Sequence, residues 1–170
     1  MTMKRTLSLI LALLMLVGLA ACSSGADKGY NGSLTQLATD LYKNNTPEFM
    51  LGEPMEIDLN DNDAVFYYLG LSDGSRLKEA VFSEPMIGSI AYSMCLVRVK
   101  DAGDVETVKK DIFDNVNTSK WICVTADQLR VAASGDVVLL VMGNGDLVDG
   151  LVSAFTTACG GLTGETLSRG

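Results

Sequence analysis

A single cysteine near the start of the chain, Cys22, lies between an apolar run and a stretch rich in serine and glycine. The chain begins with a basic segment that holds Lys4 and Arg5, and residues 7–19 are almost wholly apolar. A basic start, a short apolar run and small residues before a cleavage point are the features of a secretory signal. The run is well short of the about 20 apolar residues that a membrane-spanning helix needs. We therefore expect residues 1–21 to be removed as a signal peptide.

The four residues Leu19-Ala20-Ala21-Cys22 have the order of a bacterial lipobox. Small side chains before the cysteine give a peptidase access to the backbone, and a cysteine thiolate is the nucleophile that can form a thioether to a diacylglycerol. Cys22 would become the first residue of the mature protein, and its acyl chains, palmitate among them, would hold the protein on the membrane. The alternative is an ordinary signal peptide cleaved nearby. We predict lipid attachment at Cys22 and a flexible tether over 22–32.

Three further cysteines, Cys95, Cys123 and Cys159, follow in the chain. Three cysteines cannot all pair within one chain, so at least one is expected to be free. Those with apolar neighbours should behave as small buried hydrophobic residues, with one disulfide as the alternative for a protein outside the cytoplasm. Their spacing matches no zinc pattern and the chain has no histidine, so we expect neither a metal site nor a Cys–His nucleophile.

Two short acidic segments have spacings that invite a ligand-binding interpretation. Residues 58–63 (DLNDND) place oxygen ligands at alternate positions, but a calcium loop needs glycine and glutamate where this chain has Asp63 and Leu69. Residues 143–146 (GNGD) precede an expected helix, whose N-terminal amides can bind an anion, but the fuller glycine-rich phosphate patterns are missing. We interpret the first as a solvated loop in which Asn62 or Asp63 caps the next helix. In the second, Asp146 is expected to occupy the positive end of the helix.

A strand break at residues 83–93 (SEPMIGSIAYS) concentrates polar side chains. One interpretation is a serine nucleophile activated by Lys78 or Lys100, although neither a nucleophile elbow nor an S-x-x-K pattern is present. The other is a strand entry in which proline and glycine shape a bulge or an edge. Strand breaks often leave main-chain groups available for an added peptide strand. We expect any peptide-binding edge here to include Glu84, Pro85, Met86 and Gly88.

The composition favours a single folded domain with an acidic surface. Without the signal peptide about 150 residues remain, which suffice for a hydrophobic core. The signal holds two of the 13 basic residues and none of the 21 acidic ones, so the net charge of the remainder is about −10. Such a chain is a poor binder of nucleic acid, and anionic lipid headgroups repel it. We expect a monomeric domain that stands off the bilayer on its tether and has no nucleic-acid partner.

The apolar periodicity predicts one α+β domain over residues 33–159. A capping box at Ser33 opens an N-terminal helix, and a polar connector follows it. Two pairs of strands are each followed by an amphipathic helix: strands at 77–82, 90–99, 129–132 and 137–142, and helices that start near 104 and 146. This ββαββα-like order predicts an antiparallel sheet of about four strands with helices packed on one face. Residues 160–170 are expected to be a flexible tail.

The two ββα units show a weak similarity at an offset of 42 residues. Residues 97–105 align without a gap on residues 139–147, and each segment reads as strand, turn and helix start. A phenylalanine, Phe113 or Phe155, follows ten residues after the shared glycine. Either an ancient duplication or chance explains the match, because a strand followed by Gly-Asp and a helix is common.

Two stretches within residues 84–142 have a recognisable pattern: EPMIGSIAYSMCLVRVK and KWICVTADQLRVAASGDVVLLVM. Their strongest points are Lys120-Trp121-Ile122-Cys123, and Gly135-Asp136 with the valine-rich strand after it. Together they resemble a family of Gram-positive lipoproteins known as domain of unknown function 4358, and the lipobox fits that family as well. The resemblance implies a lipid-anchored α+β domain. It supplies no catalytic residue, cofactor or ligand.

The sequence therefore predicts a lipoprotein on the extracytoplasmic face of the cell membrane. We expect its domain to be a non-catalytic binding or accessory module for an envelope protein or peptide, without a cofactor. The alternative is an envelope hydrolase or transferase that uses Ser/Lys chemistry or paired acids such as Glu53 with Glu56, or Asp111 with Asp114. A cleft with converging ionisable groups would favour the enzyme, whereas an exposed apolar edge would favour the binding module.

Overall fold

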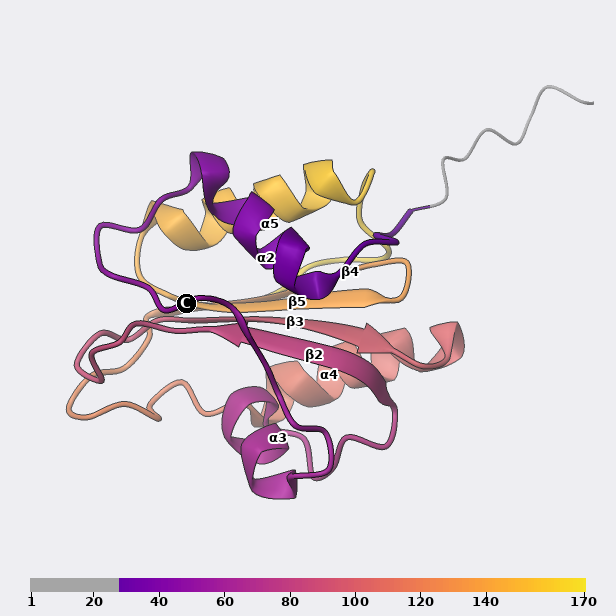
Figure 1. The fold of residues 1–170 in the computed structure, drawn as a ribbon, viewed down its shortest axis with the longest axis horizontal. Coiled ribbons are helices and arrows are strands. Elements are labelled where there is room, and N and C mark those ends of the chain that lie inside the picture. The colour runs from indigo at the N-terminus through magenta and orange to yellow at the C-terminus, as the bar shows by residue number, and fades with distance from the viewer. Residues whose placement is uncertain (1–27) are drawn as a thin grey trace, which may run out of the picture.

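The computed structural model describes residues 28–170, so the predicted signal peptide and Cys22 lie outside the described residues. One antiparallel sheet of six strands, in the order β1-β2-β3-β5-β4-β6, forms its centre (Figure 1). The strands are β1 (Met55–Glu56), β2 (Leu77–Ser83), β3 (Ser93–Val99), β4 (Gln128–Ser134), β5 (Val137–Gly143) and β6 (Leu167–Arg169). The helices are α2 (Leu34–Leu41), α3 (Asn62–Leu69), α4 (Val105–Asn115) and α5 (Asp146–Ala158), with 3-10 turns at Tyr42–Asn44 and Ala102–Asp104. The predicted α+β class and the ββαββα order after an N-terminal helix are confirmed.

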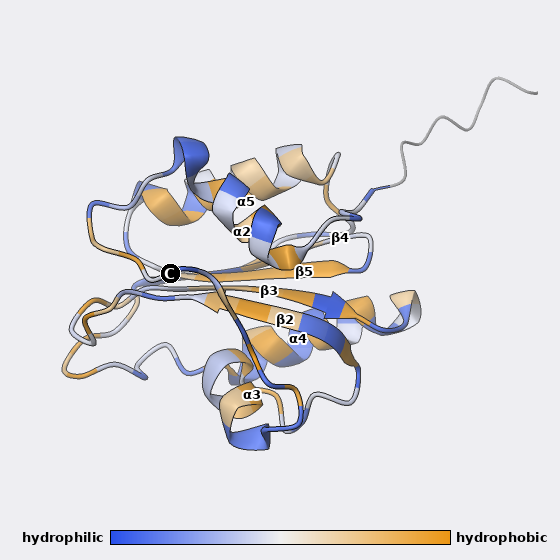
Figure 2. Ribbon diagram, in the orientation of Figure 1, coloured by the Kyte–Doolittle hydropathy of each residue, from blue (hydrophilic) through white to orange (hydrophobic). Residues whose placement is uncertain are grey.

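Helices cover both faces of the sheet, where the sequence predicted one face only. Helices α2 and α5 pack on one face, and α3 and α4 pack on the other (Figure 1). The reason lies in the central strands, since every residue of β3 and β5 is buried and both strands are hydrophobic along most of their length (Figure 2). A strand that is apolar on both sides needs cover on both sides, so the domain has three layers.

The weak internal repeat has no counterpart in a symmetry of the fold. Strands β3 and β5 are antiparallel neighbours, and the two-fold axis that exchanges such strands is normal to the sheet and preserves each face. The aligned residues Val97 and Leu139 nevertheless face opposite sides, and so do the helices that follow them, α4 and α5. The similarity therefore reflects a shared strand–turn–helix pattern rather than two superposable units.

The two outer strands raise the number from the predicted four to six. Strand β1 lies in the segment predicted as a polar connector and pairs with β2. Strand β6 lies within residues 160–170, which were predicted to be a flexible tail, and pairs with β4. The amide of Thr163 also donates to the carbonyl of Ala133 at 2.7 Å. Main-chain hydrogen bonds to the sheet hold residues 160–170 in place, and such bonds cannot be predicted from a pattern of side chains.

Candidate functional site

The two ends of the sheet are built differently, and the strand register defines them. Arg98 of β3 pairs with Val137 at one end, and Ser93 pairs with Met142 at the other. The entry end comprises residues 28–33, where the described chain begins, together with the β4–β5 turn. The loop end comprises segments 84–92 and 117–127, which lead into β3 and β4. Figure 1 shows the entry end on the right and the loop end on the left.

A buried arginine fastens the entry end. The Arg98 side chain is only 8% exposed, although it belongs to an otherwise apolar strand. Its guanidinium donates to the carbonyls of Tyr30 and Gly32, both at 2.8 Å, and to Asp136 Oδ1 at 3.0 Å. Its Nε lies 3.4 Å from Glu79 Oε2. The planar fork of arginine allows one side chain to hold several acceptors at once, so Arg98 ties the incoming chain to the sheet.

Further bonds hold the first described residues in place. The Gly29 amide donates to the carbonyl of Cys159 at 3.0 Å, and Lys28 Nζ donates to the carbonyl of Leu162 at 2.7 Å. Glu79 Oε1 accepts from the amide of Leu34, the first residue of α2, at 3.1 Å. Residues 28–32, predicted as part of the tether, are therefore bonded to the domain. Five residues, 23–27, remain between Cys22 and the bonded segment.

A buried lysine occupies the loop end. The Lys120 side chain is 3% exposed, and its Nζ lies 2.6 Å from Oε1 of Glu84, which is 14% exposed. The same Nζ lies 4.6 Å from the ring centroid of Tyr67, 5.1 Å from that of Tyr68 and 5.5 Å from that of Trp121. A carboxylate and three ring faces are the surroundings that an ammonium cation prefers. Lys120 thereby pins segment 117–127 against α3 and the sheet.

This arrangement bears on the predicted Ser/Lys chemistry. The lysine near a serine is Lys120, whose Nζ lies 3.4 Å from Ser93 Oγ, whereas Lys100 donates to the carbonyl of Ser75. Ser93 is fully buried, so a substrate cannot reach its hydroxyl without movement of the loop. The pair therefore lacks the open approach that a nucleophile needs.

The predicted peptide-binding residues lie in the loop end, and some of their main-chain groups are bonded within the chain. The carbonyl of Glu84 accepts from the Gly52 amide at 3.2 Å, and Pro85 forms a bridge with Leu51. The carbonyl of Gly88 accepts from the Ile122 amide at 3.2 Å. What this segment presents to a partner is its side chains.

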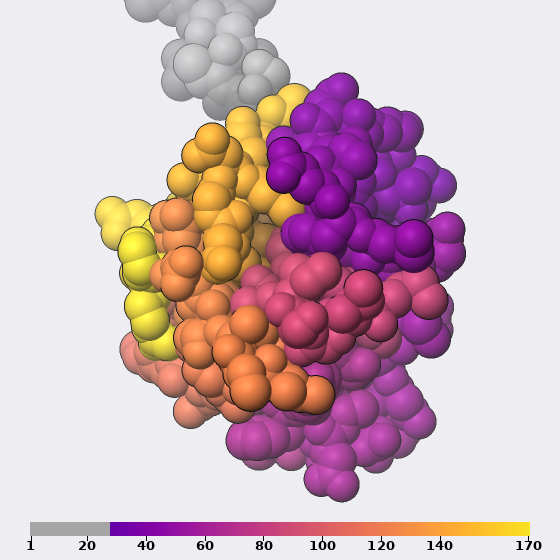
Figure 3. All heavy atoms as spheres, turned by 90° about the vertical axis from the view of Figure 1, so that its left-hand side faces the viewer, coloured from indigo at the N-terminus to yellow at the C-terminus, as the bar shows by residue number. Residues whose placement is uncertain are grey.

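Four exposed apolar side chains lie at the loop end or, for Met50, on the segment that bridges to it through Leu51 and Pro85. We refer to these four side chains as the loop-end patch. Their exposed fractions are 71% for Met50, 73% for Met86, 57% for Ile87 and 74% for Ile122. Figure 3 looks onto this end, where segments 84–92 and 117–127 meet. Large apolar side chains gathered on a surface mark an interaction site more often than scattered ones do.

Two cavities beside the patch share Phe49, Asn144 and Leu147 in their walls. Their volumes are about 440 Å³ and about 410 Å³. They lie at the start of α5, where the GNGD segment forms a turn with Gly145 in a left-handed conformation (φ 72°). Asp146 lies in the first helical turn, as predicted. Asn144 Oδ1 accepts from the Asp127 amide at 3.0 Å, which joins this turn to segment 117–127.

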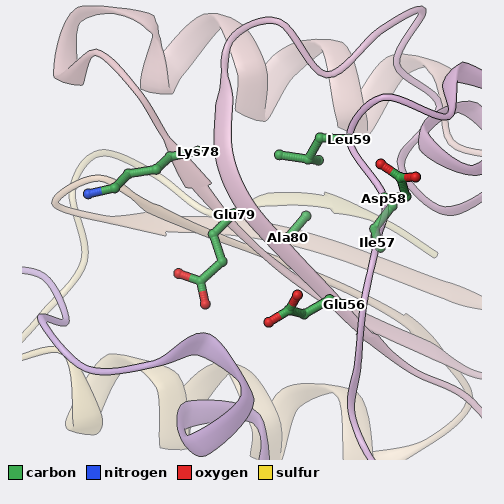
Figure 4. Close-up of a pocket in the computed structure, with 7 residues that line it drawn as sticks. All are labelled: Glu56, Ile57, Asp58, Leu59, Lys78, Glu79 and Ala80. Carbon is green, nitrogen blue, oxygen red and sulfur yellow. The ribbon is translucent and has the colours of Figure 1, made fainter.

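A third groove, of about 620 Å³, lies between the segment after β1 and strand β2. Figure 4 shows the carboxylates of Glu56 and Glu79 on the same side of the strands, whereas Asp58 and Lys78 point elsewhere. Glu79 is already bonded to Arg98 and to the amide of Leu34. The groove therefore offers no pair of free acids that converge on one substrate atom.

The other predicted acidic sites have structural partners. Asp111 pairs with Arg76 at 2.6 Å, and Asp114 pairs with Lys110. In the DLNDND segment, Asp61 Oδ1 accepts from the amides of residues 63 and 64 and caps α3, one residue before the predicted cap. Within residues 28–170, no three His, Cys, Asp or Glu side chains are arranged to hold a metal ion.

The cysteines divide into two kinds. Cys95 and Cys159 are buried, as predicted, and burial raises the pKa of each thiol to about 11. Cys123, predicted to be buried, is exposed, because it lies on segment 117–127 with a left-handed backbone (φ 61°). All three are free thiols in the described chain.

Two buried hydroxyls meet beneath the loop end. The hydroxyls of Tyr42 and Tyr92 lie 2.8 Å apart. Desolvation raises the pKa of Tyr42 to about 12 and raises that of Tyr92 well above its usual value. Neither hydroxyl ionises readily. The hydrogen bond between them joins the turn after α2 to the residue before β3.

Comparison of the chain with protein-family models, with curated proteins and with solved structures finds no match. Over residues 28–170, none of the helices has the length and apolar character to cross a membrane.

Proposed function

We propose that this protein is a lipoprotein held on the extracytoplasmic face of the cell membrane through Cys22, and that its domain is a non-catalytic binding module. The observation that carries the proposal is the lipobox, placed six residues before a segment that is bonded to the domain. An acylated cysteine at that position would hold the domain close to the bilayer.

Three structural features support a binding role over a catalytic one. The buried cations Arg98, Lys109 and Lys120 are each paired with a carboxylate. The serine nearest a lysine is closed to substrate. In the groove between β1 and β2, the acids do not converge as a general acid and base must. An exposed apolar surface remains, and this is the kind of feature through which accessory proteins bind partners.

Metabolic labelling with an alkyne fatty acid tests the anchor. The full-length protein should be labelled and should sediment with membranes, because the Cys22 thiol accepts the diacylglycerol. Cys22→Ala should lose both the label and the sedimentation. Cys123→Ala, a change at the exposed cysteine of the described chain, is the matched control and should keep both. Label that persists in Cys22→Ala would refute the proposal.

A further inference from the structure

The position of the anchor orients the domain. The chain enters at the entry end, where Arg98 bonds to the carbonyls of Tyr30 and Gly32. Lys28 lies six positions after Cys22, and six steps of extended chain span at most about 20 Å. An anchor at Cys22 therefore keeps the entry end near the bilayer. The loop end, at the other end of the strands, then faces away from it.

The segments that carry the loop-end patch are joined to one another. Its side chains come from three separate segments that main-chain contacts hold together. The Ile122 amide donates to the Gly88 carbonyl, which joins segments 117–127 and 84–92. The bridge between Leu51 and Pro85 joins the segment of Met50 to the same surface. Three segments thus present their apolar side chains at one end of the sheet.

The charges around the patch are acidic. Glu48 and Asp146 line the cavity of about 410 Å³ beside it, and Glu53 lines a smaller one nearby. Of the nearby lysines, Lys120 is buried against Glu84 and Lys43 pairs with Asp40 at 2.8 Å. The surroundings of the patch are therefore negative, in keeping with the acidic composition of the chain.

The position and the charge of the loop-end patch distinguish between its candidate partners. A second copy of the chain would bring acidic surroundings against acidic surroundings, which is unfavourable. The membrane that holds the anchor lies at the other end, and its anionic headgroups repel an acidic surface. A protein segment that carries both apolar and basic side chains matches the patch and its surroundings.

We propose that the loop end is the docking surface of this lipoprotein and that its partner is an apolar, basic segment of another envelope protein, bound on the side away from the membrane. The inference rests on the proposed function, since the anchor at Cys22 sets the orientation. Met86 and Ile122 contact the apolar side chains of the partner, and Glu48 and Asp146 face its basic ones.

In-cell photo-crosslinking of the full-length protein tests this inference. A benzoylphenylalanine at position 122 or 86 should form one discrete adduct with another protein. The same residue at position 107, an exposed position of α4, is the control and should form none. The cross-linked peptide should contain apolar residues and carry a net positive charge. The double change Glu48→Lys/Asp146→Lys should reduce the adduct at least five-fold.

Each other result overturns the inference: an adduct with a second copy, with lipid or with an acidic segment, an adduct that is equal at position 107, or none at all. Fatty-acid labelling of the same cells separates the two proposals. Labelled protein without the expected adduct refutes the docking surface and leaves the anchor intact. Loss of the label refutes the proposed function itself.

Discussion

The entry end and the loop end are each fastened by one buried cation, but in different ways. Arg98 belongs to a central strand and donates hydrogen bonds to two carbonyls and a carboxylate. Lys120 belongs to an irregular segment and has one carboxylate and three aromatic rings around it. Hydrogen bonds from a guanidinium are directional, whereas cation–π contacts with an ammonium tolerate movement.

The difference matches what each end would do. An end that transmits a tether to the domain needs a fixed geometry, which the Arg98 network supplies. An end that receives a partner benefits from side chains that can adapt, and the exposed Met50 and Met86 are of that kind. Under the proposed function, membrane attachment and partner binding lie at opposite ends of one sheet.

The largest effect is expected from Arg98→Met at the entry end. The change leaves two carbonyls and the carboxylates of Glu79 and Asp136 without their buried partner, so the free energy of unfolding should fall by about 4 kcal/mol. Urea denaturation measures it. Arg76→Met is the matched control, because Arg76 and its partner Asp111 are both well exposed, at 37% and 40%, and should cost less than about 1 kcal/mol. Equal losses in the two variants would contradict the special role of Arg98.

The next effect concerns the loop end. Lys120→Met and Glu84→Gln should each lower the free energy of unfolding by about 3 kcal/mol, because each leaves a buried partner unpaired. The double variant should lose clearly less than the sum, with a coupling of about 2 kcal/mol. Hydrogen exchange should accelerate in segment 117–127 and not in residues 28–34. Additive losses would show that the pair is not coupled.

A smaller effect should follow from alkaline pH. The pKa of Tyr42 is raised to about 12 in the fold, whereas an unfolded chain ionises its tyrosines near pH 10. The stabilisation from Tyr42 is therefore complete below pH 10 and is lost as pH rises to 12, by about 2 kcal/mol. Urea denaturation at pH 8 and pH 11 should show about 1.4 kcal/mol of this loss, and Tyr42→Phe should reduce it. An unchanged pH dependence in Tyr42→Phe would exclude this hydroxyl as the cause.

The smallest effect on stability is expected at the loop-end patch. Ile122→Ser should change the free energy of unfolding by less than about 0.5 kcal/mol, since the side chain is exposed. Ile112→Ser is the matched control, because Ile112 of α4 is fully buried and should cost about 3 kcal/mol or more. A large loss in Ile122→Ser would mean that the patch belongs to the core.

The sequence alone predicted those features that are stabilised by residues close by in the chain. Ser33 accepts from the Gln36 amide and opens α2 as the capping box predicted. The Ser134-Gly135-Asp136 turn joins β4 to β5, with Gly135 in a left-handed conformation (φ 57°). In both cases a residue within three positions satisfies the backbone, so the sequence pattern carries the information.

Features that depend on distant partners were not predictable in this way. Strand β3 is buried on both sides, so helices are needed on both faces of the sheet. The apolar pattern of this strand predicted that it is central but did not specify which helices pack on it. Arg98 carried one signal, a lone charge in an apolar strand. Lys120 carried none, because its carboxylate and two of its rings come from segments 36 to 53 residues earlier in the chain.

The orientation of the domain on the membrane is the most direct test of the account. Mature acylated protein with Cys123→Ser would carry a fluorophore on Ala102→Cys at the entry end or on Ile122→Cys at the loop end, and would be reconstituted in vesicles with a headgroup quencher. Cys95 and Cys159 are buried and should not be labelled. Quenching of the fluorophore should be several-fold stronger at position 102 than at position 122. Equal quenching, or stronger quenching at position 122, would contradict it.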